Sequence, residues 1–407
     1  MNRLADDPTL LRMRAELGAE EALMHRGIFT DQDTGRDYFT GYAYETLYDW
    51  DQYFEAIVQI YMGWPATYIE NGVTIFLEHQ QESGMISRSV PSNEYHDPEH
   101  VKPFLAQIAL LVAEVYGETD WILNEHYYPR LRRYIDYWLT AMDRNGNGLS
   151  EWMSAPHTGM DNQHERAGYW LDQFSEGVDL NCYLVRELRA FALLAQRYGK
   201  IDIAETYAQT AADLAQRIRK LLWNEVDGFF YDGNARAAEP FKSRKAGWGA
   251  INTPNEALIR VKSVAAFAAL WAEVATPEQA RRMVFEHLFN PREFWTPYPV
   301  SALAKSERWY SRDHFPCDMG CGWRAQTWVP TNYMVYRGLR AYGYHQLASL
   351  VAQYTRDLVV KAGNREYYDA ETGDGLGLDP FWGWSLLAHF LPYEEHVDSD
   401  ITAIAEL

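Results

Sequence analysis

Residues 179–223, DLNCYLVRELRAFALLAQRYGKIDIAETYAQTAADLAQRIRKLLW, contain the pattern that decides the fold. Apolar side chains recur every three to four positions in both halves of this stretch, which is typical of amphipathic helices. The first stripe comprises Leu180, Leu184, Leu188, Phe191 and Leu194, and the second Ala208, Ala211, Leu214, Ile218 and Leu221. Gly199 separates them, and glycine is favoured just past a helix end. The stretch therefore predicts two helices, 179–198 and 201–223, made antiparallel by a short link.

The same apolar period along the rest of the chain predicts a run of helices. With the two above, the expected ranges are 4–24, 50–62, 65–80, 101–116, 120–142, 179–198, 201–223, 255–275, 277–289, 330–342, 344–361 and 381–391. Short connections alternate with long ones, and the long ones span 25–49, 81–100, 143–178, 224–254, 290–329 and 362–380. If successive helices run up and down, every long connection emerges on the same rim.

This alternation predicts an all-α fold: an (α/α)6 barrel, or toroid, with long active-site loops on one rim. No linker or low-complexity stretch divides the chain, so we expect a single catalytic domain over residues 1–407. Short strands within the long loops are expected at segments such as Gly228–Tyr231. An open helical solenoid is the alternative, but its repeats would share a fixed-period motif that this sequence lacks.

Charge and composition restrict the partners. The formal net charge of −20 argues against nucleic acid and against an anionic membrane surface, since both require a basic face. No run of 18 apolar residues predicts a membrane span, and the first residues do not resemble a signal peptide. Three cysteines, an odd and sparse set, favour a reducing compartment, so we expect a cytoplasmic location. The oligomeric state stays open, a homo-oligomer included.

Aromatic and acidic residues gather in the long connections. The chain has 15 Trp and 28 Tyr, and Tyr44, Tyr48, Trp50 and Asp51 stand together at the end of the first connection. Carboxylates that grip hydroxyl groups and indole rings that stack on sugar C–H faces are typical of a carbohydrate cleft. Cleavage of a glycosidic bond needs two carboxyl groups, and the pattern alone does not select the pair among 57 acidic residues.

Five motifs in order resemble glycoside hydrolase family 63, especially its bacterial branch of mannosylglycerate and glucosylglycerate hydrolases, and more distantly the trehalases. They are Trp50–Phe54, Gly159–Asn162, Trp323-Arg324 with Trp328, Glu366–Tyr368, and Gly375–Gly377 before Trp384-Ser385. The resemblance implies an (α/α)6 barrel and an inverting α-glycosidase with Asp161 as general acid and Glu366 as general base. It also implies a substrate pocket, for which we expect Tyr44, Tyr48, Trp50, Asp51, Asn162, Trp323, Arg324, Gln326, Trp328 and Trp384.

Departures from the family pattern leave the sugar, the linkage and the aglycone open. The segment Trp323–Gln326 differs from the family's Trp-Arg-Gly-Pro. Arg88 and Lys102 add positive charge near the predicted rim, where either could meet an anionic aglycone such as glycerate; salt bridges to nearby acidic residues are the favoured interpretation. Asp369 and Glu371 rival Glu366 as the base.

We expect no cofactor and no metal. The segment 143–151 contains the first half of a calcium loop, but Ser154 stands where the last ligand is expected, so a turn rich in Asx residues is favoured. Two other functions stay open: a sugar epimerase or lyase on the same toroid, which usually relies on His or Tyr, and a non-catalytic carbohydrate-binding protein.

Overall fold

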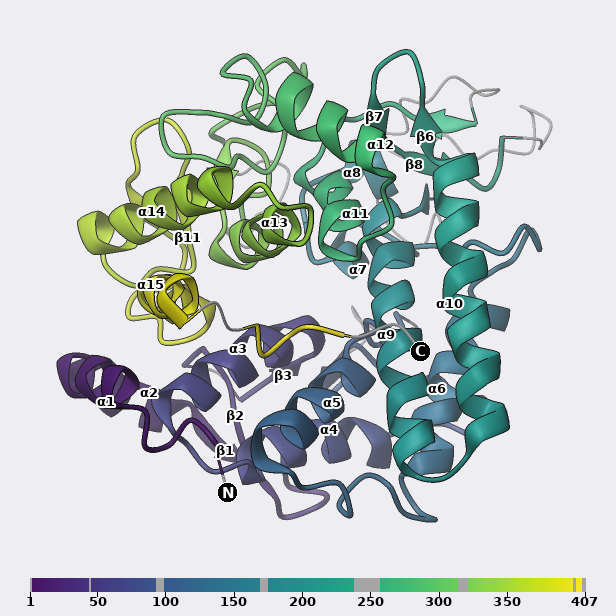
Figure 1. Ribbon diagram of the computed structural model, residues 1–407, viewed down its shortest axis with the longest axis vertical. Coiled ribbons are helices and arrows are strands. Elements are labelled where there is room, and N and C mark those ends of the chain that lie inside the picture. The colour runs from purple at the N-terminus through teal and green to yellow at the C-terminus, as the bar shows by residue number, and fades with distance from the viewer. Residues whose placement is uncertain are drawn as a thin grey trace.

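The structure is a computed structural model that describes residues 2–43, 45–92, 99–168, 175–237, 257–313, 321–397 and 400–404. It is rich in helices, which form an inner and an outer set (Figure 1). The inner set is α3 (Asp49–Met62), α5 (Leu105–Tyr116), α9 (Val178–Arg197), α11 (Ala268–Trp271), α13 (Val329–Ala341) and α15 (Leu387–Val397). The outer set is α1 (Pro8–Glu16), α2 (Gly18–Met24), α4 (Thr67–Glu78), α6 (Tyr128–Thr140), α10 (Ile201–Leu221), α12 (Pro277–Arg282) and α14 (His345–Ala362).

The inner helices contact one another in a closed sequence. α3 contacts α5, α5 contacts α9, and the contacts continue through α11 and α13 to α15, which packs back against α3. Figure 1 shows these helices around a common centre, with α10 and α14 outside them. α1 contacts both α3 and α15, so the first and last helices of the chain lie together.

The inner and outer helices differ in how much of their surface is buried. Every residue of α3 is buried, including Asp49, Asp51 and Glu55, whereas α10 buries one stripe and exposes the rest. A helix that is buried on all sides belongs to a core, and a helix with one apolar stripe covers it. Charged residues on a fully buried helix need local partners: Asp49 and Asp51 line the pocket described below, and Glu55 accepts a hydrogen bond from the Gly41 N–H.

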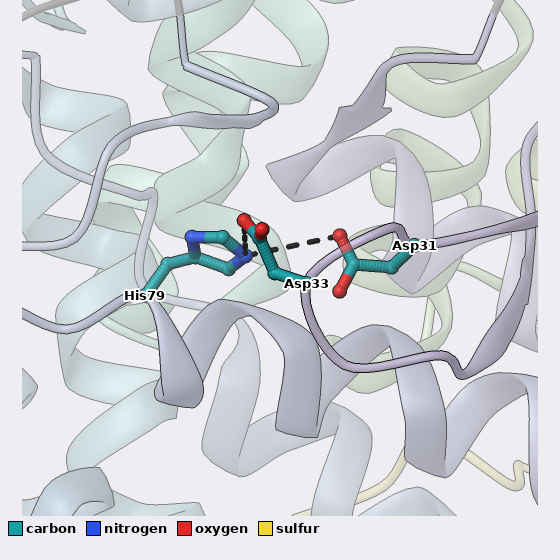
Figure 2. Close-up of side chains that lie close together, drawn as sticks. All are labelled: Asp31, Asp33 and His79. Atoms are coloured by element: carbon teal, nitrogen blue, oxygen red, sulfur yellow. Dashed lines mark ion pairs between the residues drawn. The ribbon is translucent and has the colours of Figure 1, made fainter.

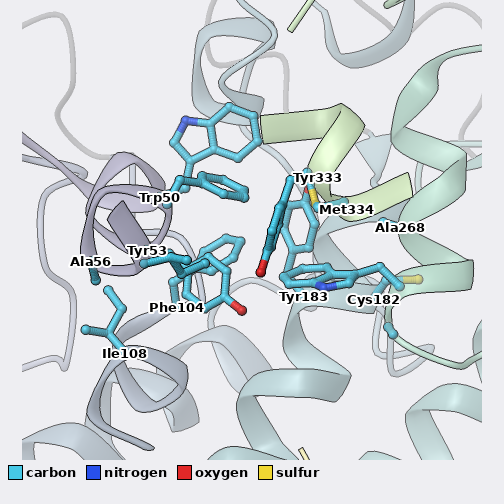
Figure 3. Close-up of a cluster of buried hydrophobic side chains, with 14 of the residues drawn as sticks. Trp50, Tyr53, Ala56, Phe104, Ile108, Cys182, Tyr183, Ala268, Tyr333 and Met334 are labelled. Carbon is cyan, nitrogen blue, oxygen red and sulfur yellow. The ribbon is translucent and has the colours of Figure 1, made fainter. Parts of the chain in front are cut away.

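Aromatic side chains fill the centre of the ring (Figure 3). Phe104 lies between Tyr53 of α3 and Tyr183 of α9, with ring centroids 5.2 and 5.0 Å away. Trp271 of α11 joins them, 5.8 Å from Tyr53. Because this core closes the middle of the ring, a ligand has access only from an end.

Five of the expected helices begin at least four residues later than predicted. Those expected at 4–24 and 381–391 begin at Pro8 and, after a 3₁₀ turn, at Leu387. The helix expected at 101–116 begins at Leu105, and the one expected at 120–142 begins at Tyr128. Pro129 explains the second shift: proline has no N–H to donate to an earlier carbonyl and is tolerated in a first turn. Where the helix 255–275 was expected, the described chain from residue 257 forms a strand and the 3₁₀ turn η3 (Val264–Phe267) before α11.

The long connections contain short elements. They include the helices η1 (His25–Gly27), α7 (Ala155–Thr158), α8 (His164–Ala167) and η5 (Trp384–Leu386), and the π-helical turn η4 (Met283–Leu288) extends α12. The strands form five small antiparallel sheets in the described ranges: β1 (Ile28–Thr30) with β2 (Asp37–Phe39), β3 (Leu47–Tyr48) with β4 (Ser89–Val90), β5 (Ser175–Glu176) with β8 (Asp232–Asn234) and β9 (Leu258–Ile259), β6 (Trp223–Asn224) with β7 (Phe229–Phe230), and β10 (Gln326–Thr327) with β11 (Tyr367–Asp369) and β12 (Gly375–Leu376). β7 confirms the strand expected near Gly228–Tyr231.

The β1–β2 hairpin packs against α4. Its turn brings Asp31 and Asp33 next to His79, the residue that follows the last turn of α4 (Figure 2). Among the described helices, none is both long and apolar enough to cross a membrane.

Candidate active site

A cavity of about 730 Å³ lies where the long connections meet the first residues of the inner helices. Within the described residues, five of the six long connections contribute to its wall, and so do the first turns of α3, α13 and η5. The lining residues are Tyr42, Tyr48, Asp49, Trp50, Asp51, Phe54, Arg88, Lys102, Pro156, Gly159, Asp161, Cys321, Trp323, Trp328, Pro330, Glu366, Tyr367, Leu376, Gly377, Leu378 and Trp384. The partial positive charge at a helix amino terminus favours carboxylates at such a site.

Most of the site residues expected from the sequence meet in this cavity. Both expected catalytic carboxyls line it, together with Tyr48, Trp50, Asp51, Trp323, Trp328 and Trp384. Tyr44 lies outside the described residues. The long connections therefore bring together groups separated by more than 300 positions in the sequence.

Glu366 stands just before β11 and is held from two sides. Its Oε2 accepts a hydrogen bond of 3.0 Å from the Leu378 N–H, and its backbone oxygen accepts one of 2.9 Å from Trp384 Nε1. Gly377 has a φ of +73°, and a Cβ there would lie 2.4 Å from Glu366 Oε2, so this turn requires glycine. Burial raises the pKa of Glu366 to about 7, and the charges of Asp161 and Asp51 add to that rise.

Asp161 follows α7, whose carboxyl end is Gly159 at a φ of +81°. A Cβ at that glycine would lie 2.9 Å from the Trp50 ring, so the loop and the first turn of α3 pack closely. Burial raises the pKa of Asp161, while the charges of Arg88 and Lys102 and a hydrogen bond from Cys321 oppose the rise. Asp161 thus has cations near it, whereas the named charges acting on Glu366 are negative.

Both pocket cations are paired with carboxylates. Arg88 Nε lies 2.7 Å from Glu99 Oε2, and its Nη1 donates to the Pro156 oxygen. Lys102 Nζ lies 3.0 Å from Asp49 Oδ1. The salt bridge favoured for Arg88 is therefore present, and Lys102 pairs with a residue of α3 instead of its sequence neighbours.

Asp51 points from α3 into the cavity and accepts a hydrogen bond from the Tyr42 hydroxyl. Burial raises the pKa of Asp51 to about 6, although the Tyr42 hydrogen bond opposes the rise. One turn later, Glu55 accepts a hydrogen bond of 2.7 Å from the Gly41 N–H, and burial raises its pKa well above the ordinary value. A chain of carboxyls thus leads from the cavity into the core.

Indole rings form a flat side of the cavity. Trp323 and Trp328 stack with their ring centroids 3.7 Å apart, and Tyr367 stacks on Trp328 at 4.5 Å. Trp328 Nε1 donates to the Gly322 oxygen, which fixes the ring. A pre-ordered aromatic wall of this kind can pack against the apolar face of a sugar ring.

Three expected substrate ligands have other contacts. Asn162 accepts a hydrogen bond from the Trp323 N–H, Arg324 Nη2 donates to Glu165 Oε2 at 3.0 Å, and Gln326 accepts one from the Arg324 N–H. None of the three lines the cavity. Asn162 and Arg324 thereby connect the loop of Asp161 to the loop of Trp323, whereas the Gln326 side chain bonds within its own connection.

The two rival bases lie outside the cavity lining. Asp369 Oδ2 pairs with Arg312 Nε at 2.7 Å, and Glu371 Oε1 pairs with Lys305 Nζ at 2.6 Å. Burial raises the pKa of each, but the ion pairs and hydrogen bonds outweigh it and hold both pKa values below their ordinary range. This geometry favours Glu366 over Asp369 and Glu371 as the candidate general base.

The loop that carries Asp161 is anchored by buried charge. Arg166 of α8 pairs with Asp179 of α9 and Asp232 of β8, and all three side chains are buried. Burial lowers the pKa of Arg166, but the two carboxylates outweigh it and hold the pKa above its ordinary value. His157 accepts from the Met153 N–H and contacts the His100 oxygen at 2.7 Å, so it supports the loop.

Some lining residues were not expected from the sequence. Tyr42, Cys321 and Leu378 are examples: Tyr42 holds Asp51, Cys321 contacts Asp161, and Leu378 holds Glu366. Leu378 acts through its backbone N–H, which leaves no side-chain signal. Cys321 is one of three sparse cysteines, and nothing in their spacing predicts a place in the cavity.

The segment 143–151 forms the turn that the sequence favoured. The side chains of Asp143, Asn145 and Asn147 accept hydrogen bonds from the backbone N–H groups of Gly148, Asn147 and Leu149, respectively. The Asn145 and Asn147 amides also donate to Glu176 Oε1.

A ring of helices with an aromatic, carboxyl-lined pocket at one end is the arrangement expected of a glycoside hydrolase. A family model described as the mannosylglycerate hydrolase MGH1-like glycoside hydrolase domain matches residues 44–385. Since this match spans most of the sequence, the chain belongs to that family of glycoside hydrolases, and the resemblance to family 63 is confirmed.

Individual relatives agree with this assignment. A mannosylglycerate hydrolase from Thermus thermophilus is 28% identical over 208 residues, which is 50% of this chain and 41% of the relative. A cytosolic neutral trehalase from Kluyveromyces lactis is 31% identical over 147 residues, 36% of this chain and 16% of the trehalase. The sequence matches to these relatives thus span less than half of each relative's length.

Solved structures share the fold. A family 63 mannosylglycerate hydrolase from Thermus thermophilus, solved with glucose, has a TM-score of 0.70 at 18% identity and covers 93% of this chain and 99% of its own. The same enzyme has also been solved with Tris and D-glycerate. The neutral trehalase Nth1 of Saccharomyces cerevisiae has a TM-score of 0.64 at 19% identity, covering 93% of this chain and 78% of its own.

Proposed function

We propose that this chain is an inverting α-glycosidase built on an (α/α)6 barrel, with Asp161 as general acid and Glu366 as general base. The observation that carries the proposal is the meeting of these two carboxyls, from the third and sixth long connections, in one cavity with a stacked indole wall. Inversion needs one carboxyl on each side of the anomeric carbon, with room for a water beside the base. Connections on opposite parts of a ring suit this arrangement.

The proposed reaction is a single displacement. Asp161 donates its proton to the glycosidic oxygen as the bond to the anomeric carbon breaks. Glu366 takes a proton from water, whose oxygen attacks the anomeric carbon from the opposite face. An α-glycoside then yields the β-sugar and a free alcohol, and a proton lost by Asp161 is balanced by one gained at Glu366.

The proposed substrate is a small α-glucoside or α-mannoside. Its aglycone is glycerate, as in glucosylglycerate and mannosylglycerate, or a second glucose in an α-linked disaccharide. Because Glu99 and Asp49 already pair with Arg88 and Lys102, an anionic aglycone finds no uncompensated cation among these two. A comparison of kcat/KM on glucosylglycerate, mannosylglycerate, trehalose and kojibiose would decide whether the aglycone is glycerate or a second glucose.

Variants of the two carboxyls test the roles directly. Asp161→Asn should lower kcat on an O-glycoside by roughly 10²–10⁴-fold but spare hydrolysis of an α-glycosyl fluoride, since fluoride leaves without protonation. Glu366→Gln should abolish both activities, because each needs an activated water. Glu371→Gln is the matched control and should retain activity, since Glu371 is ion-paired outside the cavity lining.

Two outcomes would contradict this mechanism. Near wild-type activity of Asp161→Asn and Glu366→Gln on O-glycosides would remove both residues from catalysis. An α-sugar as the first product in time-resolved NMR would show retention of configuration. The single catalytic domain over residues 1–407 and the cytoplasmic location stay predictions.

A further inference from the structure

We infer that Asp31, Asp33 and His79 form a binding site for one divalent transition-metal ion, with Zn²⁺ as the favoured ion. His79 Nε2 lies 3.8 Å from Asp31 Oδ1 and 3.8 Å from Asp33 Oδ2 (Figure 2). All three ligand atoms fall within 4.8 Å of one another. None of these residues lines the catalytic cavity, so the site is separate from the proposed chemistry.

The imidazole of His79 is positioned to bind a metal ion. Its Nε2 is buried and has no hydrogen-bond partner among the described residues, and a buried polar atom in that state is costly. Figure 2 shows this nitrogen directed at both carboxylates. His79 also caps the carboxyl end of α4, with its N–H donating to the Ile75 oxygen. The partial negative charge at a helix carboxyl end favours a cation there.

Asp31 is held in the orientation that a ligand needs. Its Oδ2 accepts hydrogen bonds from the Thr34 N–H at 2.8 Å and the Thr34 hydroxyl at 2.6 Å, and its Oδ1 is the oxygen nearer His79. Metal-binding carboxylates are commonly fixed by outer hydrogen bonds of this kind. The Asp33 side chain is 78% exposed and can therefore rotate to close the site.

The ligand set selects the class of ion. One imidazole and two carboxylates suit Zn²⁺, whereas Mg²⁺ and Ca²⁺ take oxygen ligands. With Zn–N and Zn–O bonds of about 2.0–2.1 Å in a tetrahedral site, two ligand atoms stand roughly 3.3–3.5 Å apart. Each of the two His79–carboxylate distances of 3.8 Å therefore needs to shorten by about half an ångström or less. Rotation of the exposed Asp33 side chain adjusts its distance from Asp31, which lies within 4.8 Å, and a water completes the tetrahedron.

A bound ion would join two elements that are distant in sequence. It would tie the turn between β1 and β2 to the end of α4, against which this hairpin packs. The chain leaving β2 reaches Gly41 and Tyr42, which hold Glu55 and Asp51 beside the cavity. The site is thus a structural clamp on the amino-terminal wall, and its signature is a gain in stability on metal binding.

Thermal unfolding of chelator-treated protein tests the inference. Zn²⁺ at about 100 times its Kd should raise the Tm by roughly 2–5 °C, and the same concentration of Mg²⁺ should leave it unchanged. Titration should give one Zn²⁺ per chain at this affinity, and Co²⁺ should produce the visible absorption of a tetrahedral site.

Variants separate this site from surface binding at other histidines. His79→Gln and Asp33→Asn should each lose the Zn²⁺-dependent shift and the Co²⁺ band. His126→Gln is the matched control, because His126 is an exposed histidine that pairs with the neighbouring Glu78, and it should retain both. Asp33 is exposed, so its variant keeps the test decisive if His79→Gln folds poorly. The absence of a shift in the wild-type protein, or an undiminished shift in Asp33→Asn, would overturn the inference.

Discussion

Glu366 combines a raised pKa with the proposed role of a base. A base must be ionised to accept a proton, and burial raises the pKa of Glu366 to about 7. We therefore predict that kcat/KM falls on the acid side with an apparent pKa of about 7, so that activity rises as the pH rises through neutrality. The profile of kcat/KM reports the free enzyme and is the quantity to measure. An acid limb near 4.3, the ordinary value for Glu, would show that the carboxyl is not desolvated.

Asp161 differs from Glu366 in its neighbours more than in its burial. Arg88 and Lys102 lower its pKa, yet the net shift is upward because burial outweighs them. The same cations pair with Glu99 and Asp49, so they balance the charge of the wall without leaving it positive. The charged groups of the pocket are therefore mainly carboxylates and cations that are already paired. These charges alone do not determine whether the aglycone is anionic or neutral.

Arg166 links three elements through two buried ion pairs, with Asp179 and Asp232. Removing one partner of such a pair leaves uncompensated buried charge. Arg166→Met should therefore lower the free energy of unfolding by about 3–5 kcal/mol, since Asp179 and Asp232 would both lose their cation.

Urea denaturation measures this loss. The matched control is Arg281→Met, which breaks the exposed pair between Arg281 and Glu278 on α12 and should leave the denaturation midpoint unchanged. Equal midpoints for Arg166→Met and the wild-type protein would contradict the anchoring role. A shift in kcat without a shift in midpoint would place Arg166 in catalysis instead.

The elements were predictable where their signals were local. The stripes of α9 and α10 and the glycine between them gave both helices within two residues, and the alternation of long and short connections holds along the described chain. The starts of α5 and α6 were wrong because apolar residues before a proline continue the period without continuing the helix. A hydrophobic pattern indicates which residues are buried. Because irregular segments can also be buried, the pattern does not mark where a helix begins.

The cavity lies at one end of the closed ring, and the last described residues, 400–404, lie at the other end. Residues 400–404 pass across the inner helices: Arg186 Nη2 of α9 donates to the Thr402 oxygen at 2.7 Å, and Arg337 of α13 lies 3.4 Å from Asp400. Figure 1 shows this segment near the centre of the ring. Ile401, 3% exposed, joins the hydrophobic core. The segment thus ties α9 to α13, two inner helices that are separated by α11 in the ring.

Truncation of Ile401 tests the contribution of this segment to the whole molecule. Ile401→Ala should lower the free energy of unfolding by about 2–5 kcal/mol, the range for a buried isoleucine. Ile201→Ala, at a position that is 49% exposed, is the matched control and should change it by less than about 0.5 kcal/mol. Similar losses in both variants, measured by urea denaturation, would show that the segment adds nothing specific to the ring.

The sequence by itself determined the helices, the rim on which the long connections gather and the motifs that hold Asp161 and Glu366. These depend on local periodicity and on residue types, which a chain displays before it folds. Only the tertiary structure decided which side of each loop faces the cavity: Asn162, Arg324 and Gln326 turn away from it, while Tyr42 and the Leu378 N–H hold the carboxyls. It also brought His79 to Asp31 and Asp33 from the far end of α4. The physical reason is that side-chain direction and backbone hydrogen bonds in irregular loops are set by long-range packing, which no local pattern records.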